Sequence, residues 1–417
     1  MMNLMEELTW RGLIKDVTSQ EVIANLLKEK SPIYCGFDPT GPSLHLGHLV
    51  PILVLMRFQA EGHKIIPVVG GGTGLIGDPS GRNSERKLLT LETSLKNAEG
   101  IKSQLAKFLD FSDINKTEMV NNYDWLGKLN VIDYLRDFGK NFPINYMLAK
   151  DTVQSRLETG ISYTEFSYMI IQSIDFYTLY KTKGCRLQLG GSDQWGNITS
   201  GVELIRKTTG DNDVAGIVMT LITKADGTKF GKSTGGSFFL DPNMTPPYSI
   251  YQYFLNTGDK DVIHYLKVFT FMDKETIDDY QKKTEEHPEL REAQRALADT
   301  MIEFIHGKEV LKEVQMMSSA LFGGEINKLS YAQLQVCLNG VPSASISEDM
   351  PLIDALVLVK AASSKREARE LLSKGTYSIN GEKISDLEYV LSRDKAIEKK
   401  LFVIRRGKKN YFMIEFK

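Results

Sequence analysis

Cysteine is scarce in this chain of 417 residues, and its three cysteines, Cys35, Cys185 and Cys337, lie far apart. An odd total with no Cys-x-x-Cys pair disfavours a disulfide framework and a thiolate zinc site, and it fits a reducing compartment. Long apolar runs are also missing. No run approaches the roughly 20 residues that span a bilayer, and Glu6 and Glu7 stand where a signal peptide needs its apolar core. We therefore expect a soluble, cytoplasmic protein with no membrane segment and no metal ion held by the chain.

Charge of one sign is not in large excess. The 51 lysines and arginines against 53 aspartates and glutamates leave a net charge of -2, so the whole chain is not a polycation built for nucleic acid. The distribution is uneven, because residues 353–417 hold 15 basic and 9 acidic side chains and carry a net charge of +6. A basic end on an acidic body predicts that this end meets a polyanion.

The pattern of apolar residues divides the chain into three segments. Between residues 33 and 223 short β-rich runs alternate with helical stretches, which predicts an α/β domain with a parallel sheet that binds its ligand at the carboxyl ends of the strands. Residues 246–322 are almost wholly helical in pattern, and residues 339–351 (NGVPSASISEDMP) have the composition of a linker. The predicted strands are 33–37, 64–69, 186–189 and 216–223, and the predicted helices are 49–60, 95–108, 164–180 and 196–207.

The last segment is small and mixed in pattern. Residues 364–373 predict a capped basic helix that Gly375 ends, and residues 377–384 predict a hairpin around Asn380-Gly381, a strong turn signal. Two basic clusters lie on or after this helix and in a late turn: Lys365, Arg366, Arg369 and Lys374, and then Arg405, Arg406, Lys408 and Lys409.

The most informative string is PTGPSLHLGH at residues 39–48, between the first predicted strand and a helix. His45 and His48 are three residues apart, so at a helix start both can face one side. Gly47 removes a side chain where a ligand would approach the backbone, and the free N–H groups of a helix N-terminus suit a phosphate. Taken alone, two histidines at this spacing are more often a chance occurrence or a structural cap than a functional site. A metal site is less favoured, because no cysteine or third histidine stands at ligand spacing.

A second string, KFGKS at residues 229–233, follows the last predicted strand through a turn. Lys229 and Lys232 flank a glycine and form a basic loop able to close on phosphates, although such loops are usually only solvated. The string is no Walker loop, because the first glycine of that motif is missing.

The predicted helix over residues 164–180 is mostly apolar, as expected of a buried helix. Tyr168, Gln172 and Asp175 nevertheless stand at i, i+4 and i+7, which places one polar stripe on one face. A buried polar group without a partner costs roughly 1–3 kcal/mol. The residues alone leave two interpretations open: the stripe faces solvent, or it forms the wall of a pocket for a small polar-aromatic ligand.

The HLGH string after the first strand and the KFGKS loop after the last together resemble the two signatures of class I aminoacyl-tRNA synthetases. Further strings narrow the resemblance to the bacterial-type tyrosyl-tRNA synthetases: YCGFDPT at 34–40, GDPSG at 77–81, the helix at 163–180 and GGSDQWGN at 190–197. The tail from about Leu352 is similar to the ribosomal-protein-S-four-like RNA-binding domain that such enzymes carry. The resemblance covers nearly the full length.

The resemblance implies a domain order. It comprises a Rossmann-like catalytic domain with an inserted dimer-interface segment (1–225), a mobile KFGKS loop with an α-helical domain (226–322), a linker (323–350) and a small α+β RNA-binding domain (351–417). The implied partners are L-tyrosine, ATP with Mg²⁺, tRNA(Tyr) and a second copy of the chain, which would dimerise through residues 130–154. The implied reaction forms tyrosyl-adenylate and then transfers the tyrosyl group to the 3'-terminal ribose of the tRNA.

The resemblance also assigns site residues. The implied tyrosine-binding residues are Tyr34 and Asp175 at the phenol, Tyr168, Gln172 and Asp78 at the ammonium group, and Gln194 near the carboxylate. The implied ATP-binding residues are Thr40 and His45 at the terminal phosphates, Cys35, His48 and Asp193 at the ribose, Gly36 and Asp38 beside them, Gly47 and Gly191 at close contacts, and Lys229 and Lys232 at the leaving pyrophosphate. Thr40, the two histidines, the two lysines, Arg82 and Arg86 are also the implied catalytic groups. Arg82 and Arg86 are either further pyrophosphate or tRNA contacts or a solvated basic turn.

The sequence departs from the general class pattern in three places. Leu46 stands in place of Ile, and Phe230 and Gly231 stand in place of Met and Ser; both departures are ordinary in the tyrosine branch. Pro51 stands where some relatives have a residue able to reach the ribose, and it has no donor for that contact.

Three other functions fit the residues less well. A tryptophan-activating relative would need an indole N–H acceptor and has less use for Tyr34 opposite Asp175. A nucleotidyltransferase that makes a dinucleotide would explain the HLGH string but not the basic tail. A non-enzymatic RNA-binding protein would leave both strings without a purpose.

Overall fold

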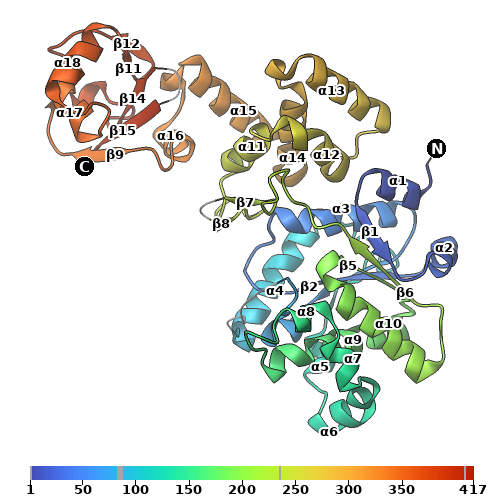
Figure 1. The fold of residues 1–417 in the computed structure, drawn as a ribbon. Helices are drawn as coiled ribbons and strands as arrows, with labels where there is room; N and C mark the ends of the chain where they lie inside the picture. Colours follow the sequence, from blue (N-terminus) through green and yellow to red (C-terminus); the bar gives the residue numbers. More distant parts are fainter. Residues whose placement is uncertain (1, 82–87, 234–235, 408–409) are drawn as a thin grey trace. The chain divides into compact units, whose positions relative to one another are not determined.

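The computed structural model describes residues 2–81, 88–233, 236–407 and 410–417. The chain forms two compact units, shown as a ribbon in Figure 1. Unit 1 comprises Met1–Met244 and Gly258–Ala293, and unit 2 comprises Thr245–Thr257 and Gln294–Lys417. Residues 258–293, which the sequence assigned to the α-helical domain, pack with unit 1.

A mixed six-stranded sheet of order β1-β6-β5-β2-β3-β4 forms the centre of unit 1. Five strands run parallel, and β1 pairs antiparallel with β6 at one edge. The apolar runs of β2 and β3 are buried on both faces, as expected for central parallel strands. The strands are β1 (Ile14–Val17), β2 (Ile33–Phe37), β3 (Ile65–Val69), β4 (Val120–Asn121), β5 (Leu187–Gly191) and β6 (Ala215–Met219).

Four long helices accompany this sheet, and each overlaps a predicted helix. The α/β prediction with a parallel sheet is confirmed, and α9 and α10 lie side by side in Figure 1. Ser162 caps the start of α9, and Gly184 ends it in the left-handed conformation at φ 63°. The helices are α3 (Leu49–Ala60), α4 (Leu91–Leu105), α9 (Tyr163–Lys183) and α10 (Trp195–Thr209).

The other α-helices of unit 1 lie before the sheet, between its strands and after it. They are α1 (Leu4–Trp10), α2 (Gln20–Lys28), α5 (Tyr123–Leu126), α6 (Val131–Asp133), α7 (Ile144–Leu148), α8 (Asp151–Gln154), α12 (Asp259–Phe269) and α13 (Lys274–Glu286). Strand β1 was not expected from the sequence, because its four residues IKDV are only partly buried and carry too little apolar pattern.

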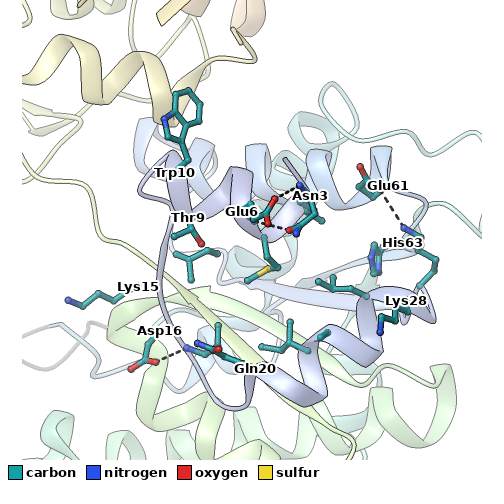
Figure 2. A pocket seen from close by; sticks show the side chains of 18 residues that line it. Asn3, Glu6, Thr9, Trp10, Lys15, Asp16, Gln20, Lys28, Glu61 and His63 are labelled. Atoms are coloured by element: carbon teal, nitrogen blue, oxygen red, sulfur yellow. Dashed lines mark hydrogen bonds and ion pairs between the residues drawn. The ribbon is translucent and has the colours of Figure 1, made fainter. Parts of the chain in front are cut away.

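A groove of about 1120 Å³ lies between α1, β1 and α2 (Figure 2). Its rim carries charged side chains such as Lys15, Asp16 and Glu61, and Asn3 and Glu6 form the capping box at the start of α1. None of the site residues expected from the sequence lines this groove.

Unit 2 combines helices with a small mixed domain. The expected helical character of residues 246–322 is confirmed by α11 (Pro247–Leu255), α14 (Glu292–His306) and α15 (Lys308–Gly323), together with α12 and α13 of unit 1. The tail contains a sheet of order β12-β11-β14-β15-β9. Its elements are α16 (Tyr331–Cys337), β9 (Ser343–Ile346), β10 (Met350–Pro351), α17 (Leu352–Leu358), α18 (Lys365–Ser373), β11 (Tyr377–Ile379), β12 (Glu382–Ile384), β13 (Val390–Leu391), β14 (Leu401–Arg406) and β15 (Asn410–Phe416).

Two details of the tail confirm the sequence pattern, and one differs from it. The hairpin β11–β12 turns through Asn380 at φ 49° and Gly381 at φ 93°, the left-handed pair that a tight two-residue turn requires. Ser364 caps α18 through the Glu367 N–H. The segment interpreted as a linker instead contains β9, which pairs in parallel with β15. Its Ser-Ala-Ser-Ile run alternates small and apolar residues, so pairing with β15 outweighs the linker-like composition.

Candidate active site

A cavity of about 330 Å³ lies at the carboxyl ends of β2 and β5 in unit 1. This is the edge at which a parallel sheet binds ligands. Its lining residues come from β2, β5, α9 and the loops after the strands. Those expected from the sequence are Tyr34, Cys35, Gly36, Asp38, His45, His48, Pro51, Asp78, Tyr168, Gln172, Asp175, Gly191, Asp193 and Gln194.

One end of the cavity holds two buried groups suited to a phenol. The hydroxyl of Tyr34 is buried and has no hydrogen-bond partner. Asp175, at 3% exposure, accepts hydrogen bonds from Asn122 Nδ2 and Trp125 Nε1, both at 2.8 Å. Burial raises the pKa of Asp175 to about 7, and burial together with Asp175 raises the pKa of Tyr34 well above its ordinary value.

A carboxylate network fixes the position of the Tyr168 ring. The Tyr168 hydroxyl donates to Asp38 Oδ2 at 2.8 Å, and the Thr73 hydroxyl donates to Asp38 Oδ1 at 2.7 Å. Burial and the neighbouring Asp38 raise the pKa of Tyr168. Gly70 follows β3 at this point, and a Cβ there would overlap Asp38 and Thr73. The glycine therefore allows the loop after β3 to close against the network.

The polar stripe of α9 faces this cavity. Tyr168, Gln172 and Asp175 all line it. Asn197 Nδ2 donates to Gln172 Oε1 and to Gln194 Oε1, both at 3.1 Å, and Gln194 Nε2 donates to Asp78 Oδ2 at 2.6 Å. A chain of amides and one carboxylate thus places the polar atoms of Gln172, Gln194 and Asp78 in the lining, which suits an ammonium or a carboxylate group.

The two histidines of the HLGH string stack face to face at the start of α3. Their ring centroids lie 3.8 Å apart. His48 Nδ1 accepts the His45 N–H, and His45 Nδ1 accepts the Gly47 N–H, both at 3.1 Å. Burial lowers the pKa of both rings, with Lys232 adding to the effect on His45 and His45 to that on His48. Because each Nδ1 accepts, each neutral ring carries its proton on Nε2 and can donate it to a phosphate or a hydroxyl group.

The KFGKS segment lies beside the HLGH string. The Leu46 N–H donates to Phe238 O at 2.9 Å, and the Phe238 N–H donates to Gly231 O at 3.0 Å. Gly231 has φ +71°, and a Cβ there would lie 3.1 Å from Leu46 Cβ. Glycine suits this position for two reasons: it adopts the left-handed conformation without strain, and it has no Cβ to crowd Leu46. Lys232 is exposed, and its positive charge contributes to the lowered pKa of His45.

The remaining expected residues fall into two groups. Thr40, Gly47, Lys229 and Lys232 do not line the cavity, and of these Thr40 and the two lysines are exposed. Arg82, Arg86, Lys408 and Lys409 lie outside the described residues. Burial raises the pKa of the Cys35 thiol to about 12, so this cysteine serves as a neutral wall of the cavity.

Sequence reasoning missed several polar residues of the site. Asn122 and Trp125 follow the two-residue strand β4, which is too short to be recognised, although its position before a polar turn is the usual signal for a strand end. Gln188 lies mid-strand beside Tyr34, lines the cavity and has a buried amide oxygen without a partner.

The basic clusters of the tail differ in how much charge they leave free. Arg366 and Arg369 are exposed on α18, whereas Lys365 pairs with Asp354 and Lys374 with Glu370, both at 2.7 Å. Arg406 is half-buried, donates to Ala361 O at 2.8 Å and lies 3.6 Å from Glu367. It therefore stabilises the domain itself and is a weaker candidate for RNA than α18.

No group of three or more His, Cys, Asp or Glu side chains in the described part of the chain could hold a metal ion. No helix among the described residues is both long and apolar enough to cross a membrane.

Comparison with known proteins gives the family. Residues 27–323 match the family model "tRNA synthetases class I (W and Y)", and residues 333–414 match the "Tyrosine--tRNA ligase SYY-like C-terminal domain". Tyrosine--tRNA ligase 1 of Bacillus licheniformis is 52% identical and that of Bacillus subtilis 53% identical, each covering 100% of both chains. A C-terminally truncated mitochondrial tyrosyl-tRNA synthetase of Aspergillus nidulans has a TM-score of 0.67 at 33% identity, over 76% of this chain and 94% of that one.

The chain belongs to the class I tRNA synthetases that the first family model describes. The match of the tail and the full-length identity to the Bacillus enzymes place it in the bacterial tyrosyl-tRNA synthetase branch of that family.

Proposed function

We propose that this chain is a tyrosine--tRNA ligase whose cavity in unit 1 joins L-tyrosine to ATP. The proposal rests on two groups that line the same cavity: the buried Tyr34 hydroxyl, which has no hydrogen-bond partner, and the buried carboxyl of Asp175. The histidines of the HLGH string line this cavity too. A buried hydroxyl without a partner costs roughly 1–3 kcal/mol, and a bound phenol would remove that cost.

In this proposal the substrate lies along α9. Its phenol donates to Asp175 and accepts from Tyr34, and its ammonium group meets Asp78, Tyr168 and Gln172. Gln194 then lies near the carboxylate. A pocket built to pair the phenol rejects phenylalanine because the polar groups would be left unpaired; this enzyme family is the standard worked case of that argument.

ATP would extend from the cavity towards the two signature strings. The proposed phosphate contacts are Thr40, His45, Lys229 and Lys232, with Arg82 and Arg86 as further candidates. The proposed ribose contacts are Cys35, His48 and Asp193, with Gly36, Asp38, Gly47 and Gly191 allowing close approach. Pro51 lines the cavity but has no donor, so it would contribute only an apolar contact to the ribose. Mg²⁺ would arrive with ATP and neutralise its phosphates.

The first step needs no covalent link to the protein. A carboxylate oxygen of tyrosine bonds to the α-phosphorus while the bond to pyrophosphate breaks in line, and the electron pair leaves with pyrophosphate. Neutral His45 and His48 donate from Nε2, and the lysines supply positive charge where negative charge grows. Catalysis would rest on positioning and on charge stabilisation that strengthens in the transition state.

In the second step a hydroxyl of the terminal ribose of tRNA(Tyr) attacks the adenylate carbonyl. The new ester bond forms, the bond to AMP breaks, and the hydroxyl proton is released. The exposed Arg366 and Arg369 of α18, with Lys365 and Lys374 beside them, are proposed to hold RNA phosphates by salt-sensitive contacts.

We also propose a homodimer in the cytoplasm, formed through residues 130–154. Four large apolar side chains of this segment are strongly exposed in the single chain, at 50–65%: Val131, Ile132, Leu135 and Ile144. Several large apolar side chains exposed within one short segment suit a protein interface. Sedimentation of the wild type and of Ile132→Asp tests this: the wild type should be a dimer and the variant should dissociate. A monomeric wild type would contradict the proposal.

Pyrophosphate exchange into ATP, run with each of the 20 amino acids, tests the main proposal. Exchange with tyrosine alone supports it. Exchange with tryptophan, or exchange without any amino acid, would replace the proposal with one of the alternative functions.

A further inference from the structure

A cluster of two buried arginines, Arg11 and Arg57, with the partly exposed Glu7 joins three helices of unit 1 outside the lining of the cavity. Arg11 and Arg57 are only 3% and 4% exposed. Glu7 accepts from Arg11 Nε at 2.7 Å and from Arg57 Nε at 3.3 Å. Although burial opposes it, pairing with Arg11 and Arg57 lowers the pKa of Glu7, so it is ionised. Two buried cations with one carboxylate leave one positive charge to be balanced elsewhere.

The end of α12 supplies that balance. Arg11 donates to the carbonyl oxygens of Lys267, Thr270 and Met272 at 2.8–3.1 Å, and Arg57 Nη2 donates to the same Thr270 oxygen at 2.7 Å. The last carbonyls of a helix lack intrahelical partners and carry its negative dipole end. The two arginines therefore cap α12 and fix it to α1 and α3.

Each of the helices α3 and α12 is connected to one signature string, α3 through the chain itself and α12 through side-chain packing. Arg57 stands near the end of α3, the helix that begins directly after His48. Helix α12 carries Phe269, whose ring stacks on Phe230 of the KFGKS segment at 4.5 Å between centroids and an interplanar angle of 22°. Tyr265 packs edge-on against the same Phe230 ring at 5.1 Å. Phe230 is 7% exposed and lies between Lys229 and Lys232.

We infer that the Glu7–Arg11–Arg57 cluster, acting through α12 and Phe230, positions the KFGKS lysines relative to the HLGH histidines for adenylate formation. It is a positioning device, because none of its three members lines the cavity. Arg57 stands nine residues after His48, so at 1.5 Å per residue it lies about 14 Å along α3 from that histidine. The inference rests on the proposed role of the lysines.

Loss of the cluster should therefore slow chemistry and leave tyrosine binding unchanged. Arg57→Met keeps the apolar stem and removes the charge and the bond to Thr270. An error of about 1 Å in the placement of catalytic groups costs up to ~100-fold in rate, so we expect adenylate formation to slow about tenfold or more in single turnover. Arg57→Lys, which retains a donor, should recover part of that rate.

A double-mutant cycle with Lys232→Ala separates positioning from general damage to the fold. If the cluster acts through the loop, Arg57→Met will add little to the loss already caused by Lys232→Ala. Phe230→Leu, which removes the stacked ring, should show the same lack of additivity, and it provides the test if Arg57→Met fails to fold.

Arg156→Met is the matched control. Arg156 is 3% exposed, close to the 4% of Arg57. Its guanidinium donates to the buried Glu165 at 2.8 Å and to Gly160 O, and neither residue belongs to a signature string. It should lower thermal stability, and its effect on the rate should be additive with Lys232→Ala. Additive losses for Arg57→Met and Phe230→Leu, or a tyrosine affinity that falls with the rate, would overturn the inference. If Lys232→Ala itself leaves the rate unchanged, the proposed role of the lysine fails instead.

Discussion

Replacing Asp175 with asparagine should make the protein more stable at high pH while removing its preference for tyrosine. Burial raises the pKa of Asp175 from 3.8 to about 7 in the folded chain. A raised pKa means that the stabilising contribution of this group is fully present below the unfolded-state value and is lost as pH rises to 7. At 1.36 kcal/mol per pKa unit, the loss is about 4 kcal/mol.

Asparagine removes this titration but introduces a mismatch. Asn122 donates to one carboxyl oxygen of Asp175 and Trp125 to the other. An amide NH₂ at position 175 must therefore face one of these two donors. Asn122 cannot simply rotate, because its own oxygen accepts the Gly72 N–H at 2.8 Å. One unpaired buried donor costs roughly 1–3 kcal/mol. Asp175→Asn should therefore be less stable than wild type by that amount at pH 4 and more stable by about 1–3 kcal/mol at pH 8.

Thermal unfolding of both proteins from pH 4 to pH 8 measures this difference, and other titrating groups cancel in it. The sign of the difference in Tm should reverse within the range. Asp211→Asn, at a half-buried carboxylate that accepts from Tyr180 at 2.7 Å, controls for replacing a carboxylate with an amide. A difference that does not change with pH would show that Asp175 is ionised in the folded chain, and retained selection of tyrosine over phenylalanine in pyrophosphate exchange would refute its place at the phenol.

Three further predictions concern the other parts of the enzyme. Tyr34→Phe should stabilise the ligand-free protein by about 1–3 kcal/mol, since it removes an unpaired buried hydroxyl, and should lower the preference for tyrosine severalfold in pyrophosphate exchange. Lys232→Ala and His45→Ala should slow adenylate formation in single turnover and leave tyrosine affinity in equilibrium dialysis unchanged, as expected for transition-state contacts; a normal rate with weak tyrosine binding would contradict this. A chain ending at Phe322 should still form adenylate but charge tRNA poorly, and undiminished charging at low tRNA concentration would show that the tail does not bind RNA.

The central sheet could be predicted from the sequence because its strands are continuous apolar runs bounded by glycine-rich turns. Strand β2 begins and ends where the pattern placed it, and so does α3. Strands β1 and β9 could not be predicted, because their alternation is weak and their pairing partners lie more than 60 residues away in the chain. Pairing over such distances is decided by the tertiary fold, which local composition does not contain.

The same distinction holds for the site. The stripe on α9 could be recognised because helical spacing places Tyr168, Gln172 and Asp175 on one face, although only the fold shows that this face meets a cavity. Asn122 and Trp125 could not be recognised, since they act on Asp175 from 53 and 50 residues away. The neighbourhood of the HLGH and KFGKS strings likewise depends on the pairing of Leu46 with Phe238.

The unfavourable features of the cavity have a common explanation. Tyr34 has an unpaired hydroxyl, Gln188 an unpaired amide oxygen, and Asp175 a raised pKa, all within one lining. Each lowers the stability of the ligand-free chain, and each would be relieved by a ligand that brings a phenol or another polar group to that atom. Because a ligand that binds only the folded state stabilises it in proportion to its affinity, tyrosine should raise the Tm of the wild type more than that of Tyr34→Phe. Phenylalanine should not distinguish the two proteins, since it leaves the hydroxyl of Tyr34 as unpaired as before.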